Sequence, residues 1–415
     1  MKSVDLLIKN ANEIVTLSGP NRPRKMKEMN ELSIIEHGSV AIDNGIIVDV
    51  GKNLTYDADE IIQANGETVL PGFVDPHTHV VFAGSREFEL DMKLKGLSYM
   101  DILKSGGGIF YTVEKTRKAT EDQLIKQAIK RLDRMLSYGT TTCEAKSGYG
   151  LDTETELKIL KVNKKLNEMH DIDIVSTFLG AHAIPKEKSA DEYTNEIINE
   201  ILPKIAHLSK FCDVFCEEGV FTVEQTKKIL GAGKNHGLIP KIHADEIVDT
   251  GGATLAAEIG AISADHLLMS SEDGLEKMAK KGVIGVLLPG TPFSLMQESY
   301  APARKIIDMG VPVALATDLN PNCWVENMQF MIQLGCLKMK MTPAEAITAA
   351  TFNAACAIDL NDTVGSIEAG KKADILVLDC PNYKHIPYHF GVNLIDSVIK
   401  NGNVENKVKG KIIIR

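Results

Sequence analysis

The chain has 415 residues, of which 44% are hydrophobic and 25% charged, a balance typical of a globular protein with a sizeable core. Its formal net charge of -10 argues against a nucleic acid as the habitual partner, because phosphate backbones bind basic surfaces. The first ten residues lack the apolar core of a signal peptide, and no later apolar run could span a bilayer, so we expect a cytoplasmic protein that acts on a small molecule.

Short strands joined by turns are predicted for the start of the chain, up to about residue 64. The last two of these strands flank Asn44-Gly45, a pair typical of two-residue hairpin turns. The predicted strands cover residues 5–8, 13–17, 39–42 and 46–50.

From residue 65 to 359, strand-like runs alternate with amphipathic helices. Residues 121–137, for example, repeat apolar side chains at the i, i+3, i+4 spacing of a helix with one buried face. Eight strand–helix units predict a closed (β/α)₈ barrel of the TIM type, whose catalytic groups project from the C-terminal ends of the strands. The eight predicted strands are residues 72–79, 140–147, 174–182, 213–219, 241–246, 262–267, 284–289 and 313–320.

After residue 359 the strand pattern returns, with predicted strands at 374–378, 397–400 and 411–414. Strands this short cannot bury themselves alone. We therefore expect residues 1–64 and 360–415 to pair into one small β-sandwich domain, built from both chain termini beside the barrel of residues 65–359. The predicted fold class is α/β.

Two histidines separated by one residue end the first barrel strand. Successive side chains of a strand point to opposite faces, so His77 and His79 lie on the same face and can grip one ion. His243 in the fifth strand and Asp318 in the eighth add a third nitrogen and a carboxylate oxygen. This donor set suits one divalent metal, zinc or iron. Such an ion lowers the pKa of bound water to about 7, which makes hydroxide available at neutral pH.

Hydroxide chemistry also requires a proton acceptor. Glu246 follows His243 by three residues and could take the proton and return it to a leaving nitrogen; the alternative is a solvated loop carboxylate. His266, in the sixth strand, could hold the water or polarise a carbonyl. Its neighbour Asp265 could be a loop salt-bridge partner.

Two loops point to an anionic substrate. Arg86, in the first loop after a barrel strand, could clamp a carboxylate bidentately, although an ordinary ion pair with Glu87 or Glu89 is the alternative. In the loop of residues 146–152, glycines let the backbone approach a ligand and Tyr149 offers a hydroxyl. A triple-glycine segment at residues 106–108 is predicted to be a flexible flap and lacks the Gly-Lys-Ser/Thr of a phosphate loop.

Five segments together resemble the amidohydrolase superfamily and, within it, the imidazolonepropionase family. They are residues 75–79, 105–109, 146–152, 178–185 and 243–246. The resemblance covers nearly the whole chain and implies hydrolysis of 4-imidazolone-5-propanoate to N-formimidoyl-L-glutamate in histidine degradation. It also implies a homodimer.

The same resemblance implies roles for individual residues. Arg86 would bind the propionate, Tyr149 and His182 would contact the substrate, and Glu246 would move the proton with support from His266. Asn320, just past Asp318, would be a further substrate contact. Asn322 and Cys323 stand where the family usually has a glycine and a small hydroxyl residue, and they are carried over as substrate contacts as well. Some related barrels hold two metals through a lysine at the end of strand four; residues 213–219 contain none, so one metal is predicted.

Two other readings of the same residues stay open. A related cyclic-amide hydrolase or an aminopyrimidine deaminase would use the same metal ligands on an uncharged base, and Arg86 would then have no anion to bind. A non-catalytic scaffold with this fold would be expected to have lost ligands, whereas all four are intact.

Overall fold

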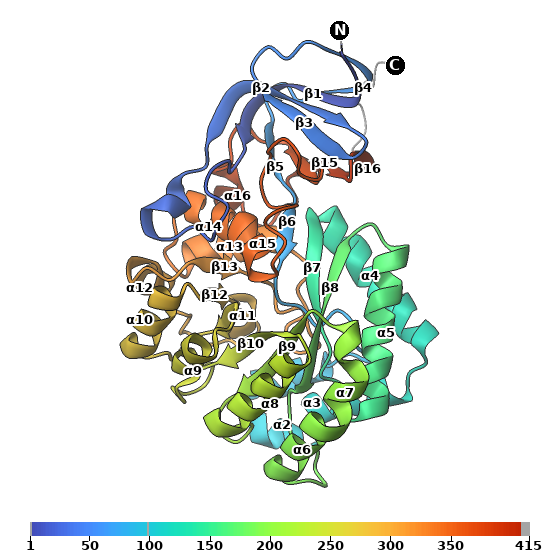
Figure 1. Ribbon diagram of the computed structural model, residues 1–415, viewed down its shortest axis with the longest axis vertical. Coiled ribbons are helices and arrows are strands. Elements are labelled where there is room, and N and C mark those ends of the chain that lie inside the picture. Colours follow the sequence, from blue (N-terminus) through green and yellow to red (C-terminus); the bar gives the residue numbers. More distant parts are fainter. Residues whose placement is uncertain (1, 98, 408–415) are drawn as a thin grey trace.

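A parallel barrel forms the body of the protein, which is described by a computed structural model for residues 2–97 and 99–407 (Figure 1). Its strands are hydrogen-bonded in chain order, from β6 to β13, and every neighbouring pair is parallel. The bounds are β6 Phe73–Asp75, β7 Thr140–Lys146, β8 Asp173–Ala181, β9 Phe211–Cys216, β10 Ile239–Ala244, β11 Ser263–His266, β12 Ile284–Leu287 and β13 Val313–Leu315. The prediction of an eight-stranded α/β barrel is confirmed.

The ring closes just beyond the ends of its first and last strands. Thr78 and Leu319 form a parallel bridge, the His79 amide donates to the Leu319 carbonyl at 2.8 Å, and the Asp318 amide donates to the His77 carbonyl at 3.1 Å. The first strand is therefore shorter than predicted and ends at Asp75. Pro76 follows and has no N–H to continue the ladder. As a result, three of the four predicted metal ligands lie on the segments that complete the ring.

Helices cover the outside of the barrel, as Figure 1 shows. The predicted helix at residues 121–137 is α4, and it begins at Thr120, whose side chain forms a capping box with Gln123. Leu124, Leu132 and others on its apolar face are buried against the strands. The α-helices are α1 Phe88–Leu94, α2 Tyr99–Lys104, α3 Ile109–Lys118, α4 Glu121–Ser137, α5 Thr153–Met169, α6 Ala190–Glu196, α7 Leu202–Ile205, α8 Val223–Asn235, α9 Gly252–Ile259, α10 Glu272–Lys281, α11 Gly290–Ser294, α12 Ala303–Asp308, α13 Met328–Leu337, α14 Pro343–Ala350, α15 Phe352–Ala357 and α16 His385–Tyr388; single turns of 3₁₀ or π helix lie at Met26–Asn30, Ile197–Ile201 and Ala206–Leu208.

Both ends of the chain pair into a second sheet, which lies at the top of Figure 1. Its strand order is β16-β15-β14-β5-β1-β2-β3, with β4 on β1. Two predicted strands merge into β1, because a bulge between Ile8 and Ala11, with Asn10 at a φ of 60°, lets the strand continue. The bounds are β1 Lys2–Val15, β2 Ile34–Asp43, β3 Ile46–Gly51, β4 Tyr56–Gln63, β5 Thr68–Pro71, β14 Ile375–Leu378, β15 Ile395–Lys400 and β16 Asn403–Lys407.

The chain passes from this sheet into the barrel at Gly72. A Cβ there would lie 2.1 Å from Oγ1 of Thr141 on β7, so only glycine fits the crossing. The predicted domain limits at residues 64/65 and 359/360 stay a prediction, and the predicted strand at 411–414 lies outside the described residues. Within the described part of the chain, no helix has both the length and the apolar character needed to cross a membrane.

Candidate metal centre and active site

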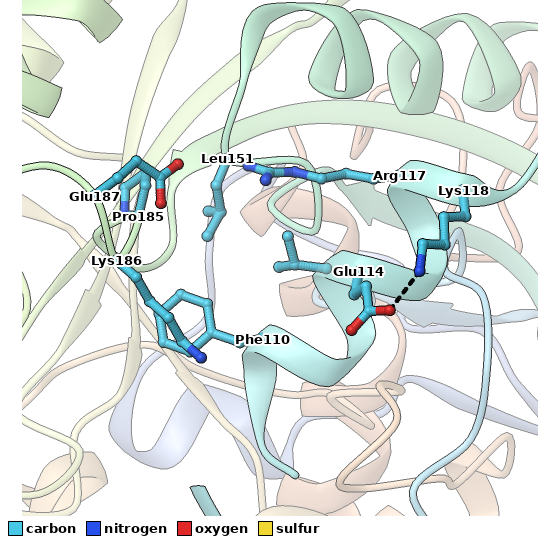
Figure 2. A pocket seen from close by; sticks show the side chains of 9 residues that line it. Phe110, Glu114, Arg117, Lys118, Leu151, Pro185, Lys186 and Glu187 are labelled. Atoms are coloured by element: carbon cyan, nitrogen blue, oxygen red, sulfur yellow. Dashed lines mark hydrogen bonds and ion pairs between the residues drawn. The ribbon is translucent and has the colours of Figure 1, made fainter. Parts of the chain in front are cut away.

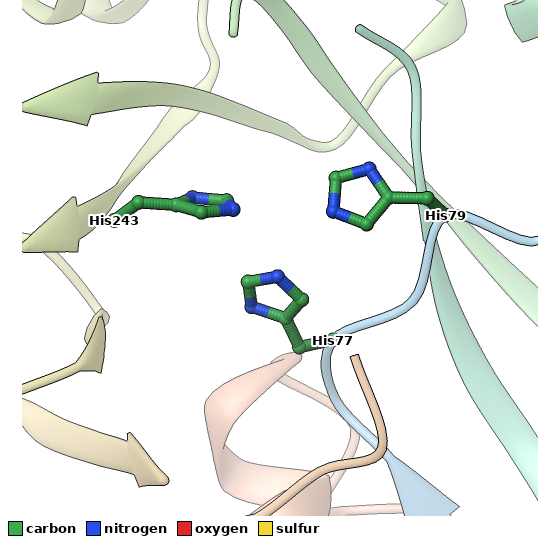
Figure 3. Close-up of side chains that lie close together, drawn as sticks. All are labelled: His77, His79 and His243. Carbon is green, nitrogen blue, oxygen red and sulfur yellow. The ribbon is translucent and has the colours of Figure 1, made fainter. Parts of the chain in front are cut away.

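Three buried imidazoles meet at the C-terminal mouth of the barrel (Figure 3). His77 and His79 come from the segment after β6 and His243 from β10, and one ligand atom of each lies within 4.8 Å of the others. Burial lowers the pKa of His77 and of His79 well below the usual value for histidine. Both rings are therefore neutral at pH 7, the form in which imidazole binds a metal.

Asp318 lies beside two of these imidazoles. Its Oδ1 lies 3.5 Å from Nε2 of His77 and 3.6 Å from Nε2 of His79, and its Oδ2 accepts a hydrogen bond of 2.6 Å from Oγ1 of Thr291. Among the described residues, Nε2 of His77 and Nε2 of His243 are buried without a hydrogen-bond partner. Unpartnered buried nitrogens beside a carboxylate are costly unless a cation binds there, so these residues fit a divalent metal.

Two further carboxylates lie behind the imidazoles, one hydrogen-bonded to His77 and the other at ion-pair distance from His243. Nδ1 of His77 donates to Oδ2 of Asp265 at 2.6 Å, which leaves Nε2 as the free lone pair. Oδ2 of Asp213, on β9, lies 3.0 Å from Nδ1 of His243. Both aspartates are fully buried. Asp265 is thus a partner of His77, whereas the sequence suggested only a loop salt bridge, and Asp213 was not singled out at all.

Glu246 and His266 lie beside the imidazoles. Oε1 of Glu246 is 3.6 Å from Nδ1 of His266, and the His266 ring centroid is 5.3 Å from that of His243. Burial raises the pKa of Glu246 to about 7 and lowers that of His266 to about 4. Only 20% of the Glu246 side chain is exposed, so it is not a solvated loop carboxylate. A carboxylate that titrates near neutrality can both accept and return a proton.

The ring of Tyr149, in the loop after β7, and that of His182, directly after β8, extend the site. His182 stacks on His79 with ring centroids 4.9 Å apart, and Tyr149 lies 5.5 Å from His79 and 5.3 Å from His182. Nδ1 of His182 donates to the carbonyl of Gly148 at 3.2 Å, which leaves Nε2 as an acceptor. Gly148 has a φ of 110°, and a Cβ on it would lie 2.8 Å from Nδ1 of His182, so the loop requires glycine here.

A pocket of about 300 Å³ lies behind this loop, next to α3 (Figure 2). It contains none of the predicted metal ligands. Arg117, one of its lining residues, donates from Nε to the carbonyl of Gly150 at 2.7 Å and contacts Asp152 at 2.8 Å. Arg117 therefore fastens the loop that carries Tyr149.

Arg86 forms the ion pair that was considered as the alternative. Its Nε and Nη2 donate to the two carboxylate oxygens of Glu89 at 2.7 and 2.8 Å, which leaves Nη1 for a ligand. Glu89 also accepts a hydrogen bond of 2.7 Å from the amide of Gly108. Since a Cβ on Gly107 would come within 2.8 Å of Glu89 Oε1, the triple-glycine segment is shaped to dock on this ion pair.

The loop after Asp318 uses its polar groups internally. Asn320 donates from Nδ2 to the Asp318 carbonyl at 2.8 Å and accepts from the amides of Asn322 and Cys323. Oδ1 of Asn322 accepts a hydrogen bond of 2.7 Å from Nζ of Lys93 on α1. The Cys323 thiol is buried, and burial raises its pKa, so it stays protonated. In this structure these three side chains hold the loop together and tie it to the loop of Arg86.

The comparisons with known proteins agree with this geometry. The sequence model of the amidohydrolase family matches residues 68–405. A protein of Alkaliphilus metalliredigens named imidazolonepropionase is 52% identical over 99% of this chain and 100% of its own length. The imidazolonepropionase of Geobacillus kaustophilus is also 52% identical, over 96% of this chain and 97% of its own.

Solved structures support the fold alone. An adenosine deaminase from Xanthomonas campestris with bound zinc superposes with a TM-score of 0.75 at 18% identity, covering 99% of this chain and 95% of its own. The strong sequence likeness over the full length, together with a histidine group at the mouth of an amidohydrolase-type barrel, leads to one conclusion. This chain belongs to the amidohydrolase family and, within it, to the imidazolonepropionases.

Proposed function

We propose that this enzyme hydrolyses 4-imidazolone-5-propanoate to N-formimidoyl-L-glutamate. The observation that supports this most is the convergence of three buried imidazoles and Asp318 beside Glu246, at the mouth of a barrel whose sequence relatives are imidazolonepropionases. The first test is to incubate the purified protein with this substrate and to follow the loss of its ring absorbance. A chelated sample, and a chelated sample given back Zn²⁺ or Fe²⁺, show whether turnover needs the metal. An aminopyrimidine and an uncharged cyclic amide test the two rival activities.

His77, His79, His243 and Asp318 would hold one divalent cation, zinc or iron. When bound, the cation supplies Lewis acidity that makes water more acidic and a carbonyl more electrophilic. His77 is held for this by Asp265 and Asp318 by Thr291. The four donors come from three separate segments whose backbones are hydrogen-bonded or buried, so they are preorganised for binding.

Glu246 would transfer the proton during the reaction. Its carboxylate would take a proton from the attacking water as the water oxygen bonds to the lactam carbon of the ring. The carbon–nitrogen bond would then break as Glu246 returns the proton to the ring nitrogen. His266 is neutral at pH 7 because burial lowers its pKa, so it can donate a hydrogen bond to the developing oxyanion.

The loops after β6, β7 and β8 would bind the substrate. Nη1 of Arg86, free of Glu89, would pair with the propionate, while Tyr149 and His182 would contact the ring. Asn320, Asn322 and Cys323 are proposed as substrate contacts from the family resemblance. A contact from Asn322 would have to replace its bond to Lys93. The homodimer and the cytoplasmic location also stay predictions; light scattering on the purified protein tests the first.

Replacement of Arg86 by alanine should raise KM for the anionic substrate about 10- to 100-fold, the usual worth of hydrogen bonds to a charged group, with a smaller change in kcat. Steady-state kinetics measure both constants. Arg304→Ala is a matched control, because Arg304 makes a similar two-point pair with Glu345 on the outer helices α12 and α14. An unchanged KM in Arg86→Ala would favour the rival enzymes that act on uncharged bases.

The rate should also depend on pH through Glu246. Because its pKa is raised to about 7, this side chain still holds a proton at pH 6 and can act as a base only above that pH. We expect kcat/KM to fall about tenfold per unit below pH 7, in a profile measured with metal content checked at each pH. An acid limb near pH 4.5, the ordinary range of glutamate, would contradict the assignment.

A further inference from the structure

Beneath the three imidazoles, the barrel interior contains a cluster of charged side chains, of which only Asp213 and Asp265 contact the histidines. Glu144 and Lys146 are two residues apart on β7, so both side chains point into the barrel. The side chains of Asp213 on β9, Lys241 on β10 and Asp265 on β11 point into it as well. All five side chains are fully buried. Buried charges are costly unless they are paired, so this arrangement calls for an explanation.

Lys146 joins the two carboxylates that hold the imidazoles. Its Nζ donates to Oδ2 of Asp213 at 2.7 Å and lies 3.5 Å from Oδ2 of Asp265. These are the same two oxygen atoms that face the histidines, since Oδ2 of Asp213 is 3.0 Å from Nδ1 of His243 and Oδ2 of Asp265 is 2.6 Å from Nδ1 of His77. One ammonium group therefore contacts the partners of two imidazoles that come from different strands.

We propose that Lys146 is a positioning residue of the metal centre. By fixing Asp213 and Asp265, it keeps the Nδ1 side of His243 and of His77 turned toward a carboxylate and directs both Nε2 atoms at the cation. This proposal rests on the metal centre under the proposed function. It adds a residue that touches neither the ligand atoms nor the substrate but decides how two ligands are oriented.

The charges of the cluster support this role. Glu144 anchors both lysines, with Oε1 2.9 Å from Lys146 Nζ and Oε2 2.7 Å from Lys241 Nζ. With Asp318, four carboxylates face two ammonium groups, which leaves two negative charges in excess. A divalent cation held by neutral imidazoles would balance that excess. The positive charge of Lys146 thus offsets the repulsion between the carboxylates of Asp213 and Asp265, which both lie close to its Nζ.

The test compares Lys146→Met with Lys400→Met for affinity toward Zn²⁺, measured by competition with a chelator of known strength. Lys400 is a matched control, because its buried Nζ bonds Asp374 at 2.7 Å and Asp173 at 2.8 Å in the region of the terminal sheet. Removing a positive charge near the site would by itself strengthen cation binding. Weaker binding in Lys146→Met therefore isolates the orienting role from the charge.

We expect Lys146→Met to bind Zn²⁺ at least tenfold more weakly than the wild type, and Lys400→Met to bind it within about twofold, although both lose thermal stability. In the Co²⁺-substituted protein, the visible absorption bands should change in Lys146→Met and not in Lys400→Met. Asp213→Asn and Asp265→Asn, which conserve volume, should each weaken Zn²⁺ binding about 10- to 100-fold.

Equal or tighter Zn²⁺ binding with an unchanged Co²⁺ spectrum in Lys146→Met would overturn the proposal. If Lys146→Met does not fold, Lys146→Gln, which keeps one donor for the carboxylates, is judged by the same two readouts. A wild-type protein that binds neither Zn²⁺ nor Co²⁺ would overturn the metal centre itself. Normal wild-type binding that no variant alters would overturn only the role of Lys146 and the two aspartates.

Discussion

Glu246→Gln is expected to lower kcat about 10²- to 10⁴-fold while leaving the fold and the metal content unchanged. Glutamine matches glutamate in shape but cannot accept a proton. Oε1 of Glu246 lies 3.6 Å from Nδ1 of His266 at the mouth of the barrel, and burial raises the pKa of this carboxylate to about 7. Steady-state kinetics at pH 8 on samples of equal metal content measure the effect.

A matched control is Glu218→Gln, which changes an exposed carboxylate in the loop after β9 and should retain wild-type kcat. A second readout is stability. In the metal-free protein, Glu246 binds its proton up to about pH 7, whereas in the unfolded chain it loses it near pH 4.5. The side chain therefore destabilises the fold increasingly as pH rises through that window, and Glu246→Gln should melt at a higher temperature than the wild type at pH 8. Near wild-type kcat in Glu246→Gln would show that another group moves the proton.

His243→Ala should abolish measurable turnover and reduce bound metal to less than about a tenth of the wild-type content. The side chain offers a buried Nε2 with no hydrogen-bond partner among the described residues, and it is the one predicted ligand from the far side of the ring. Three nitrogens and a carboxylate make a complete site, and loss of one donor leaves a weak one. Metal analysis and activity are measured on the same samples.

His236→Ala is the corresponding control, because His236 is an exposed residue at the end of α8 and should retain both metal and activity. Added Zn²⁺ or Fe²⁺ should restore a chelated wild-type enzyme but not His243→Ala. Full metal content and turnover in His243→Ala would exclude this residue as a ligand. A wild-type protein without zinc or iron, unable to take up either, would instead support a scaffold that has lost its chemistry.

Much of the fold could be predicted from the sequence. The eight barrel strands lie in the predicted order, and both chain ends pair into one sheet, because alternation of apolar and polar residues is a property of contiguous segments. The ends of some strands differ from the prediction. The first strand stops at Asp75, since Pro76 interrupts the ladder, and Asp318 lies beyond β13 with a φ of 54°.

The grouping of His77, His79 and His243 was also within reach of the sequence, because the barrel topology brings all C-terminal strand ends to one face. The side chains that contact these histidines could not be predicted from the sequence in the same way. The sequence suggested only a salt bridge for Asp265, and it singled out no role for Glu144, Lys146 or Lys241. Their spacing of two residues, at 144/146 and 241/243, was the available signal that they point into the barrel.

The residue types and their order along the chain thus specify the barrel, and they predict the metal ligands and an anion-binding role for Arg86. The closure of the ring decides the rest: that Lys146 reaches Asp213 and Asp265 across three strands, that Arg86 pairs with Glu89 and not Glu87, and that Asn322 bonds Lys93. The physical reason is that a strand's own pattern sets which side chains point inward. Which of them touch depends on the tilt and stagger of all eight strands, and no single segment carries that information.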